Sequence, residues 1–115
     1  PAPIGPYSQA VLAGNVLYVS GQIALDATTG NLVMGSLEEE TRKVLSNLKA
    51  VLMAAEMDFS HVVKCSIFLS SMNDFAEVNA IYGESFSKNP PARETVEVAG
   101  LPKGVNVEIS CIAVK

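Results

Sequence analysis

The sequence predicts an α+β domain in which two helices cover one face of a β-sheet. Segments with alternating polarity and many β-branched residues lie near both ends of the chain, at residues 6–23 and 93–114. Two segments with apolar residues at helical spacing lie between them, separated by a third alternating segment at residues 61–70. The predicted order is therefore hairpin, helix, strand, helix, hairpin, and 115 residues fit a single domain, 1–115.

The first hairpin is predicted around Gly14 and Asn15, a two-residue turn that tolerates positive φ. Pairing Ala13 with Val16 gives the hairpin one face with polar and aromatic side chains and one with small, mostly apolar side chains. The first face carries Tyr7, Gln9, Val11, Tyr18, Ser20 and Gln22, and the second carries Ser8, Ala10, Leu12, Leu17, Val19 and Gly21.

A turn at residues 26–30 precedes the first helix. This helix is predicted to begin after Ser36, because Ser36 and Glu39 have the spacing of a capping box. The helix is expected to end near Met57, and apolar residues mark its buried side. They are Leu37, Thr41, Val44, Leu45, Leu48, Val51, Leu52 and Ala55.

The central strand and the second helix come next. His61 stands at the entrance of the strand with no acidic or Cys partner in its segment, which favours a surface or capping role over catalysis. The second helix begins at Asp74 and ends before Pro90, which delivers the chain to the last strands. The predicted core residues of these two elements are Val63, Cys65, Ile67, Leu69, Phe75, Val78, Tyr82 and Phe86.

The end of the chain predicts a second hairpin, closed by the loop at residues 99–104. If Val98 lies opposite Val105, Arg93 and Glu108 become diagonal neighbours on the polar face, roughly 7–8 Å apart. Arginine suits a planar carboxylate ligand, and a half-buried glutamate suits proton transfer with water. The alternative is that the two side chains form a cross-strand salt bridge that only stabilises the sheet.

Composition excludes several classes of function. The net charge is −4 and the basic residues are scattered, which argues against nucleic-acid binding. No apolar run has the length of a membrane span. Cys65 and Cys111 are far apart with no His nearby in sequence, which favours buried inert thiols and argues against a metal site. We expect neither metal nor cofactor.

Hydrophobic residues make up 49% of the chain, which is high for a small domain. The sheet face away from the helices is predicted to be partly apolar, and nothing in the chain is left to cover it. We therefore expect self-association through this face. Its apolar residues are Val11, Tyr18, Phe68, Ile112 and Val114.

Several motifs carry a resemblance to a known family. They are Ile-Gly-Pro-Tyr-Ser-Gln-Ala at residues 4–10, Val-Ser-Gly-Gln-Ile at 19–23, Pro-Ala-Arg at 91–93, Leu-Pro-Lys-Gly at 101–104 and Val-Glu-Ile at 107–109. In this order they resemble the Rid (YjgF) family over essentially the whole chain, and most closely its RidA branch of enamine/imine deaminases. The resemblance implies a chorismate-mutase-like fold and a homotrimer with ligand sites in the clefts between subunits.

The resemblance also implies roles for individual residues. Arg93 would bind the substrate carboxylate, Glu108 would position the hydrolytic water and Tyr7 would line the pocket. Ser20, Gly21 and Asn79 match pocket positions more weakly. The sequence departs from the family where many members have Cys two residues after the arginine and Glu-Ala after the last Glu-Ile. Here Thr95 and Ser110-Cys111 occupy these positions. Thr95 leaves a hydroxyl and a backbone N–H for ligand binding but no thiolate, so substrate preference stays open.

The reaction implied is hydrolysis of short 2-imino or 2-enamino acids, such as tautomers of 2-aminoacrylate and 2-aminocrotonate, to 2-oxo acids and ammonia. Pyridoxal-phosphate-dependent dehydratases release these reactive intermediates, so a cytoplasmic detoxifying role is expected, or a mitochondrial one if a targeting segment has been removed. Three alternatives remain at this point: a non-catalytic sensor of small 2-oxo acids or amino acids, a ribonuclease or translation inhibitor, and a holdase-like chaperone.

Overall fold

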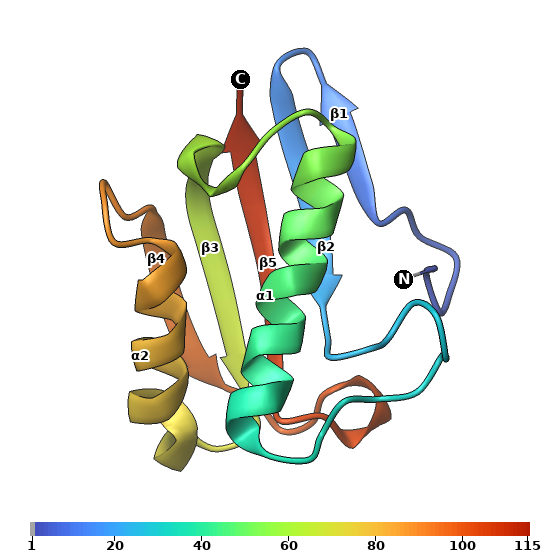
Figure 1. Cartoon of the computed structure of the whole chain (residues 1–115), viewed down its shortest axis with the longest axis vertical. Helices are drawn as coiled ribbons and strands as arrows, with labels where there is room; N and C mark the ends of the chain where they lie inside the picture. The colour runs from blue at the N-terminus through green and yellow to red at the C-terminus, as the bar shows by residue number, and fades with distance from the viewer. Residues whose placement is uncertain (1) are drawn as a thin grey trace.

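The computed structural model describes residues 2–115, which form a five-stranded sheet and two helices (Figure 1). The spatial order of the strands is β1-β2-β5-β3-β4. Only β3 and β4 run parallel, and the other neighbours are antiparallel. The strands are β1 (Ala10–Ala13), β2 (Val16–Gln22), β3 (Val62–Leu69), β4 (Ala92–Glu97) and β5 (Val107–Val114), and the helices are α1 (Leu37–Ala54) and α2 (Phe75–Ser85).

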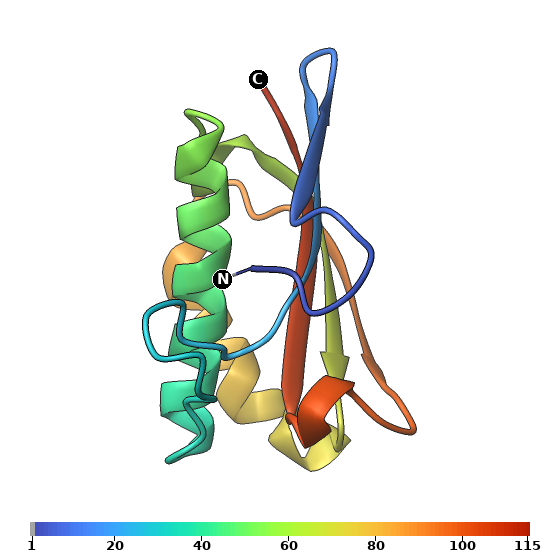
Figure 2. The same cartoon turned by 90° about the vertical axis from the view of Figure 1, so that its right-hand side faces the viewer.

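Both helices cover the same face of the sheet, as the sequence predicts. Figure 2, seen along the edge of the sheet, shows α1 and α2 on one side and no helix of comparable length on the other. The hydrophobic core fills the space between the two layers, where Leu48, Leu52, Ile67 and Ile109 are almost completely buried. The fold class is therefore confirmed as α+β with two helices on one face.

The first hairpin has the predicted register, with Ala13 opposite Val16 and Gly14 at a φ of 62°. The predicted faces, however, are wrong at the end of β2. A bulge between Val19 and Gln22 inserts an extra residue opposite β5 and reverses the alternation. As a consequence Gln22 is buried instead of facing outwards with Tyr18. The bulge also turns Gly21 toward Glu108.

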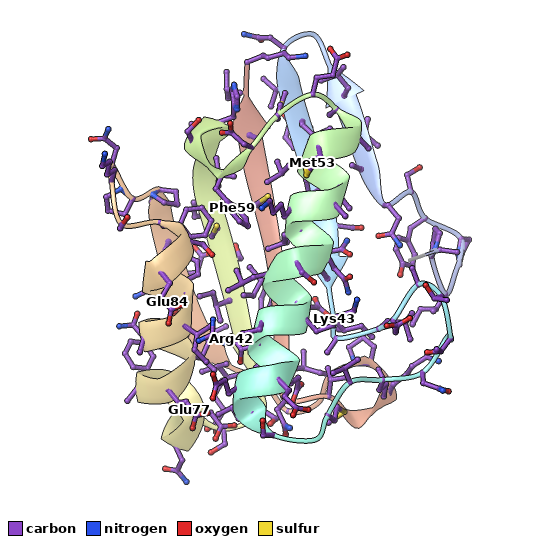
Figure 3. All side chains as sticks on the ribbon, viewed as in Figure 1. Arg42, Lys43, Met53, Phe59, Glu77 and Glu84 are labelled. Atoms are coloured by element: carbon purple, nitrogen blue, oxygen red, sulfur yellow. The ribbon has the colours of Figure 1, made fainter. Side chains whose placement is uncertain are left out.

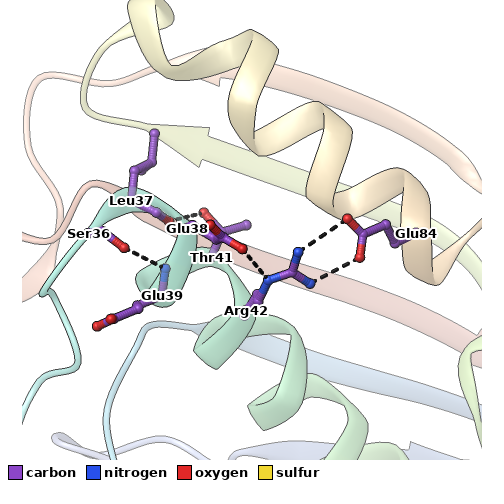
Figure 4. Close-up of polar contacts among 7 residues, drawn as sticks. All are labelled: Ser36, Leu37, Glu38, Glu39, Thr41, Arg42 and Glu84. Atoms are coloured by element: carbon purple, nitrogen blue, oxygen red, sulfur yellow. Dashed lines mark hydrogen bonds and ion pairs between the residues drawn. The ribbon is translucent and has the colours of Figure 1, made fainter.

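The first helix begins where the sequence predicts and ends slightly earlier. The Ser36 Oγ accepts a hydrogen bond from the Glu39 N–H at 3.1 Å (Figure 4), and α1 ends at Ala54, before the expected Met57. Arg42 then ties α1 to α2, because its guanidinium donates to the carboxylate of Glu84 (Figures 3 and 4). These charges are solvent-exposed, so the pair contributes little stability.

His61 is a capping residue, as predicted. Its Nδ1 accepts a hydrogen bond from the Asp58 N–H at 3.0 Å, in the turn that leads into β3. The predicted core residue Val63 is instead exposed, because an irregularity between Val62 and Lys64 shifts the alternation at the start of β3. None of the helices within residues 2–115 is long and apolar enough to cross a membrane.

The predicted second hairpin is wrong. The strand that carries Arg93 is β4, and it pairs in parallel with β3, so that Arg93 lies opposite Cys65 and Thr95 opposite Ile67. The physical reason is that α2 crosses over the sheet between β3 and β4, and such a crossover returns the chain in the same direction. Strand β5 enters on the other side of β3, at the centre of the sheet.

Candidate functional site

Arg93 and Glu108 lie on opposite faces of the sheet. Arg93 pairs with Cys65, which is fully buried beneath the helices, so Arg93 belongs to the helix-covered face. Glu108 pairs with Phe68, which lies three positions after Cys65 in β3. An odd number of positions along a strand changes the face, so Glu108 lies on the face that no helix covers, the open face. The expectation that the two side chains are diagonal neighbours is wrong. The simple salt bridge is excluded as well, because Arg93 forms no ion pair within residues 2–115.

Arg93 is held by α2. Its Nη1 donates to the Asn79 Oδ1 at 2.6 Å, and its guanidinium carbon lies 5.0 Å from the ring centroid of Tyr82 and 5.8 Å from that of Phe75. Thr95 points to the same side of β4 and carries a buried hydroxyl without a hydrogen-bond partner in the described chain. The remaining donors of Arg93 likewise have no partner there, so the guanidinium can accept a carboxylate.

Glu108 lines a depression on the open side of the sheet. The depression has a volume of about 210 Å³, and Glu108 is half-buried there. This burial raises the pKa of the Glu108 carboxyl above its usual value, because a charged carboxylate is poorly solvated in such a place. The lining residues are Ile4, Tyr7, Gly21, Ile23, Pro102 and Glu108.

Gly21 makes room for the Glu108 carboxylate. A Cβ at this position would overlap a carboxylate oxygen of Glu108, so the absence of a side chain permits the observed contact. The predicted site residue Gly21 thus lies directly beside Glu108, and the bulge in β2 is what brings it there.

Tyr7 and Ser20 complete this side of the site in different ways. Tyr7 is 46% exposed, and its hydroxyl accepts a hydrogen bond from the Ile4 N–H at 3.3 Å. The Ser20 hydroxyl donates to the carbonyl oxygens of Ser8 at 3.1 Å and Gln9 at 2.9 Å. Ser20 therefore fixes the segment that carries Tyr7, and its proton is already committed to the backbone.

The predicted site residues fall into two groups in one chain. Tyr7, Gly21 and Glu108 lie together at the depression, which Ser20 does not line, and Asn79, Arg93 and Thr95 lie together under α2. Strand β3 separates β4 from β5, which places these strands roughly 10 Å apart, two strand spacings.

Sequence analysis missed Glu40, which positions the start of β5. This glutamate is 1% exposed, and its carboxylate accepts hydrogen bonds from the Asn106 N–H at 2.7 Å, the Asn106 Nδ2 at 2.8 Å and the Val107 N–H at 3.1 Å. Glu108 directly follows Val107, so these hydrogen bonds fix the start of the strand that carries it. The available signal was an acidic residue three positions after Leu37 on the buried stripe of α1.

The two cysteines lie opposite each other on β3 and β5 in the core. Burial raises the pKa of the Cys65 thiol, and it raises that of Cys111 to about 12. Neither is therefore a thiolate at neutral pH, which agrees with the predicted role as buried inert residues. Within residues 2–115, no three His, Cys, Asp or Glu side chains come close enough together to hold a metal ion.

Comparison with known proteins identifies the family to which the chain belongs. A sequence model of the endoribonuclease L-PSP family matches residues 1–115. The human protein named 2-iminobutanoate/2-iminopropanoate deaminase is 47% identical over all of this chain and 84% of its own length. A putative endoribonuclease from Thermotoga maritima has a TM-score of 0.97 at 51% identity, with 100% of this chain and 91% of that chain covered. TdcF from E. coli with bound serine has a TM-score of 0.95 at 37% identity, with 100% and 92% covered.

The fold is a small α+β domain with two separate polar clusters, and it is shared with solved proteins of the Rid and YjgF type. The chain belongs to the endoribonuclease L-PSP family, which is also called the Rid or YjgF family. Its relatives include proteins named as deaminases of short 2-imino acids.

Proposed function

We propose that the protein hydrolyses short 2-imino acids to 2-oxo acids and ammonia at a site shared between two subunits of a homotrimer. The observation that carries this proposal is the separation of the two clusters. Arg93 can bind a carboxylate on the helix-covered face, and Glu108 can activate water on the open face, but one chain does not bring them together. A neighbouring subunit that supplies the other cluster would complete the site.

The open face supports such an assembly. Val11, Tyr18, Val63 and Val96 are each 41–53% exposed, so the face keeps an apolar surface that water would solvate poorly. The depression beside Glu108 opens on this same side of the sheet. Covering the face with a second copy would bury the apolar residues and desolvate Glu108 further, which strengthens electrostatic contacts with a bound ligand.

The chemistry follows from these groups. The guanidinium of Arg93 holds the substrate carboxylate by two parallel hydrogen bonds, which fixes the position of the imine carbon. Glu108 accepts a proton from water as the water oxygen adds to this carbon. With the imine bound in its protonated form, this addition gives a neutral carbinolamine. The carboxylic acid of Glu108 returns its proton to the nitrogen. Ammonia then leaves as the C–N bond breaks, while the hydroxyl of the carbinolamine gives its proton to Glu108 and becomes the carbonyl of the 2-oxo acid. The raised pKa of Glu108 suits both steps, because it brings the group closer to neutral pH.

Relatives provide the substrate class. The human, bovine and goat relatives are named 2-iminobutanoate/2-iminopropanoate deaminases, and the E. coli relative TdcF was solved with serine, which also carries an α-carboxylate. Pyridoxal-phosphate-dependent dehydratases that release such imines would supply the substrate without a stable complex, and the activity would be needed in the compartment where they act.

A second candidate is a non-catalytic sensor of small amino or 2-oxo acids, which the serine-bound relative favours. It would use the same Arg93 cluster but show no turnover. Ribonuclease activity, to which the family description refers, is less well supported by this chain, because a net charge of −4 repels a polyanion.

The test is complementation between two inactive variants in an assay coupled to threonine dehydratase. Arg93→Ala and Glu108→Gln should each lose at least a hundredfold in kcat/KM while remaining folded trimers. When the two variants are refolded together, the mixture should regain about one quarter of wild-type activity. In randomly assembled trimers, a quarter of the sites combine an intact Arg93 from one chain with an intact Glu108 from another. Absence of recovery in verified mixed trimers would contradict the shared site.

A further inference from the structure

Helix α2 presents three side chains to the Arg93 guanidinium. Phe75, Asn79 and Tyr82 stand at helical spacing on one side of α2, so a single element contacts the arginine three times. Asn79 binds one edge of the guanidinium through Nη1. The guanidinium carbon lies over both rings and is closer to Tyr82, at 5.0 Å from its ring centroid against 5.8 Å from that of Phe75.

We infer that Tyr82 is a positioning residue for Arg93, on which the binding of the ligand carboxylate depends. The inference rests on the proposed function of Arg93 and adds a residue that the sequence assigned only to the core. An arginine side chain has many rotamers, and ordering it when the ligand binds costs conformational entropy. A ring that holds the guanidinium beforehand removes part of this cost and leaves the free donors turned away from α2.

The ring of Tyr82 is rigid enough for this role. Tyr82 is 5% exposed, and its ring packs against Phe86 with 4.6 Å between centroids. Phe86 in turn packs edge-to-face against Phe59 at 4.9 Å. A cation held against a buried ring is attracted more strongly than one at an exposed site, because less water competes for it.

The hydroxyl group of Tyr82, unlike its ring, is not needed to support Arg93. Its oxygen is buried, and in the described chain its polar neighbour is the Cys65 thiol, which is a weak hydrogen-bond partner. Burial raises the pKa of the Tyr82 phenol well above its usual value, so the group stays neutral. Ring and hydroxyl can therefore be separated by substitution: support for Arg93 requires the ring alone.

The experiment compares ligand binding in four single variants of the intact protein. The probe is 2-oxobutanoate, a stable 2-oxo acid, with its Kd measured by calorimetry beside the melting temperature. Tyr82→Leu should raise the Kd about tenfold, within the range of a desolvated cation–π contact. Tyr82→Phe should bind within about twofold of wild type, because it keeps the ring. The matched control is Phe86→Leu, which removes a ring from the same aromatic cluster without touching Arg93; it should lower the melting temperature and raise the Kd less than Tyr82→Leu does.

Arg93→Ala is the reference that separates two kinds of failure. If Arg93→Ala binds 2-oxobutanoate like wild type, the proposed function of Arg93 is wrong. If Arg93→Ala loses binding while Tyr82→Leu keeps the wild-type Kd, or Phe86→Leu raises the Kd as much as Tyr82→Leu, the positioning role of Tyr82 is overturned. If Tyr82→Leu does not fold, Tyr82→Met replaces it, because methionine fills the volume without a π face. Its Kd for 2-oxobutanoate is then compared with that of wild type in the same way.

Discussion

Gly21→Ala should inactivate the protein by displacing Glu108 while leaving the fold intact. The Cβ of alanine would overlap a carboxylate oxygen of Glu108 and also approach its Cδ and Cγ atoms at 2.6 and 2.9 Å. These atoms belong to a side chain that can rotate, and Gly21 does not have a positive φ that would strain an alanine. The overlap is therefore relieved by turning Glu108 out of its observed position.

The magnitudes of the two effects differ. Moving Glu108 to a less favourable rotamer costs about 0.5–1.5 kcal/mol, so the melting temperature should fall only slightly. Losing a correctly placed proton acceptor costs about 10²–10⁴-fold in rate. We expect kcat in the dehydratase-coupled assay to fall at least a hundredfold, with the Kd for 2-oxobutanoate within a few-fold of wild type, because Arg93 is untouched.

Two comparisons make this prediction specific. Gly83→Ala is the matched control, because a Cβ at Gly83 in α2 meets no atom within 4 Å; it should keep activity and raise stability by about 0.5–1 kcal/mol. The double variant Gly21→Ala/Glu108→Gln should be no slower than Glu108→Gln alone, since both changes remove the same function. Wild-type kcat in Gly21→Ala, or additive losses in the double variant, would refute the reasoning.

Three further predictions concern single groups. Because burial raises the pKa of Glu108 above its usual 4.5, the folded state holds this proton more tightly than the unfolded state. Stability should therefore fall as pH rises through the window just above 4.5, and Glu108→Gln should lack this component of the pH-dependent stability. In the same way, kcat should fall as pH drops through the raised pKa, because the carboxylate that accepts the proton is lost. Glu40→Gln should destabilise the protein by about 1–3 kcal/mol in urea unfolding, because one of the two acceptor oxygens becomes an NH₂ group, which would face another donor, either Asn106 Nδ2 or the N–H groups of Asn106 and Val107; an unchanged midpoint would contradict the role of Glu40. Thr95→Val should leave thermal stability unchanged or slightly higher, since the Thr95 hydroxyl is buried without a partner, and a raised Kd for 2-oxobutanoate would show that the hydroxyl binds ligand.

Local patterns in the sequence were sufficient for the helices and the first turn. The Ser36 cap and the Gly14-Asn15 turn depend on neighbours within three residues, and both formed as predicted. The pairing of β4 depends on an interaction that is distant in sequence. A short loop between two alternating segments suggested a hairpin, whereas the helix between β3 and β4 already indicated a parallel crossover. The strand–helix–strand order was the better signal.

For the candidate site, too, local motifs were sufficient to identify residues, whereas contacts between segments distant in sequence were not predicted. Residue types and motifs identified Arg93, Asn79, Gly21 and Glu108, and the structure places them in two polar clusters. The face of Gly21 could not be obtained from alternation alone, because the bulge in β2 reverses the alternation after Val19 and leaves no mark in the polarity of the sequence. The face of Arg93 depends on the parallel pairing of β4 with β3. Glu40 is recognised only when α1 and β5 are seen together, since its three hydrogen bonds reach residues 66 and 67 positions away.

A rearrangement within one chain cannot replace assembly of the site from two chains. To bring Arg93 to the face of Glu108, β4 would have to slip by one residue against β3 or turn over, because the side-chain period of a strand is two. Slipping would also carry Thr95 out of the core-facing row and bring the charged side chain of Glu94 into it. Six residues of β4 pair with Lys64 to Leu69 of β3, so turning over would break this whole ladder and the contact of Arg93 with Asn79. Each lost backbone hydrogen bond costs about 1 kcal/mol or more where the groups become buried without partners, and no new contact in the chain would compensate. The proposed shared site requires none of these changes, because the open face of a second chain would bring a complete Glu108 cluster, already shaped around Gly21, to an Arg93 that α2 already holds.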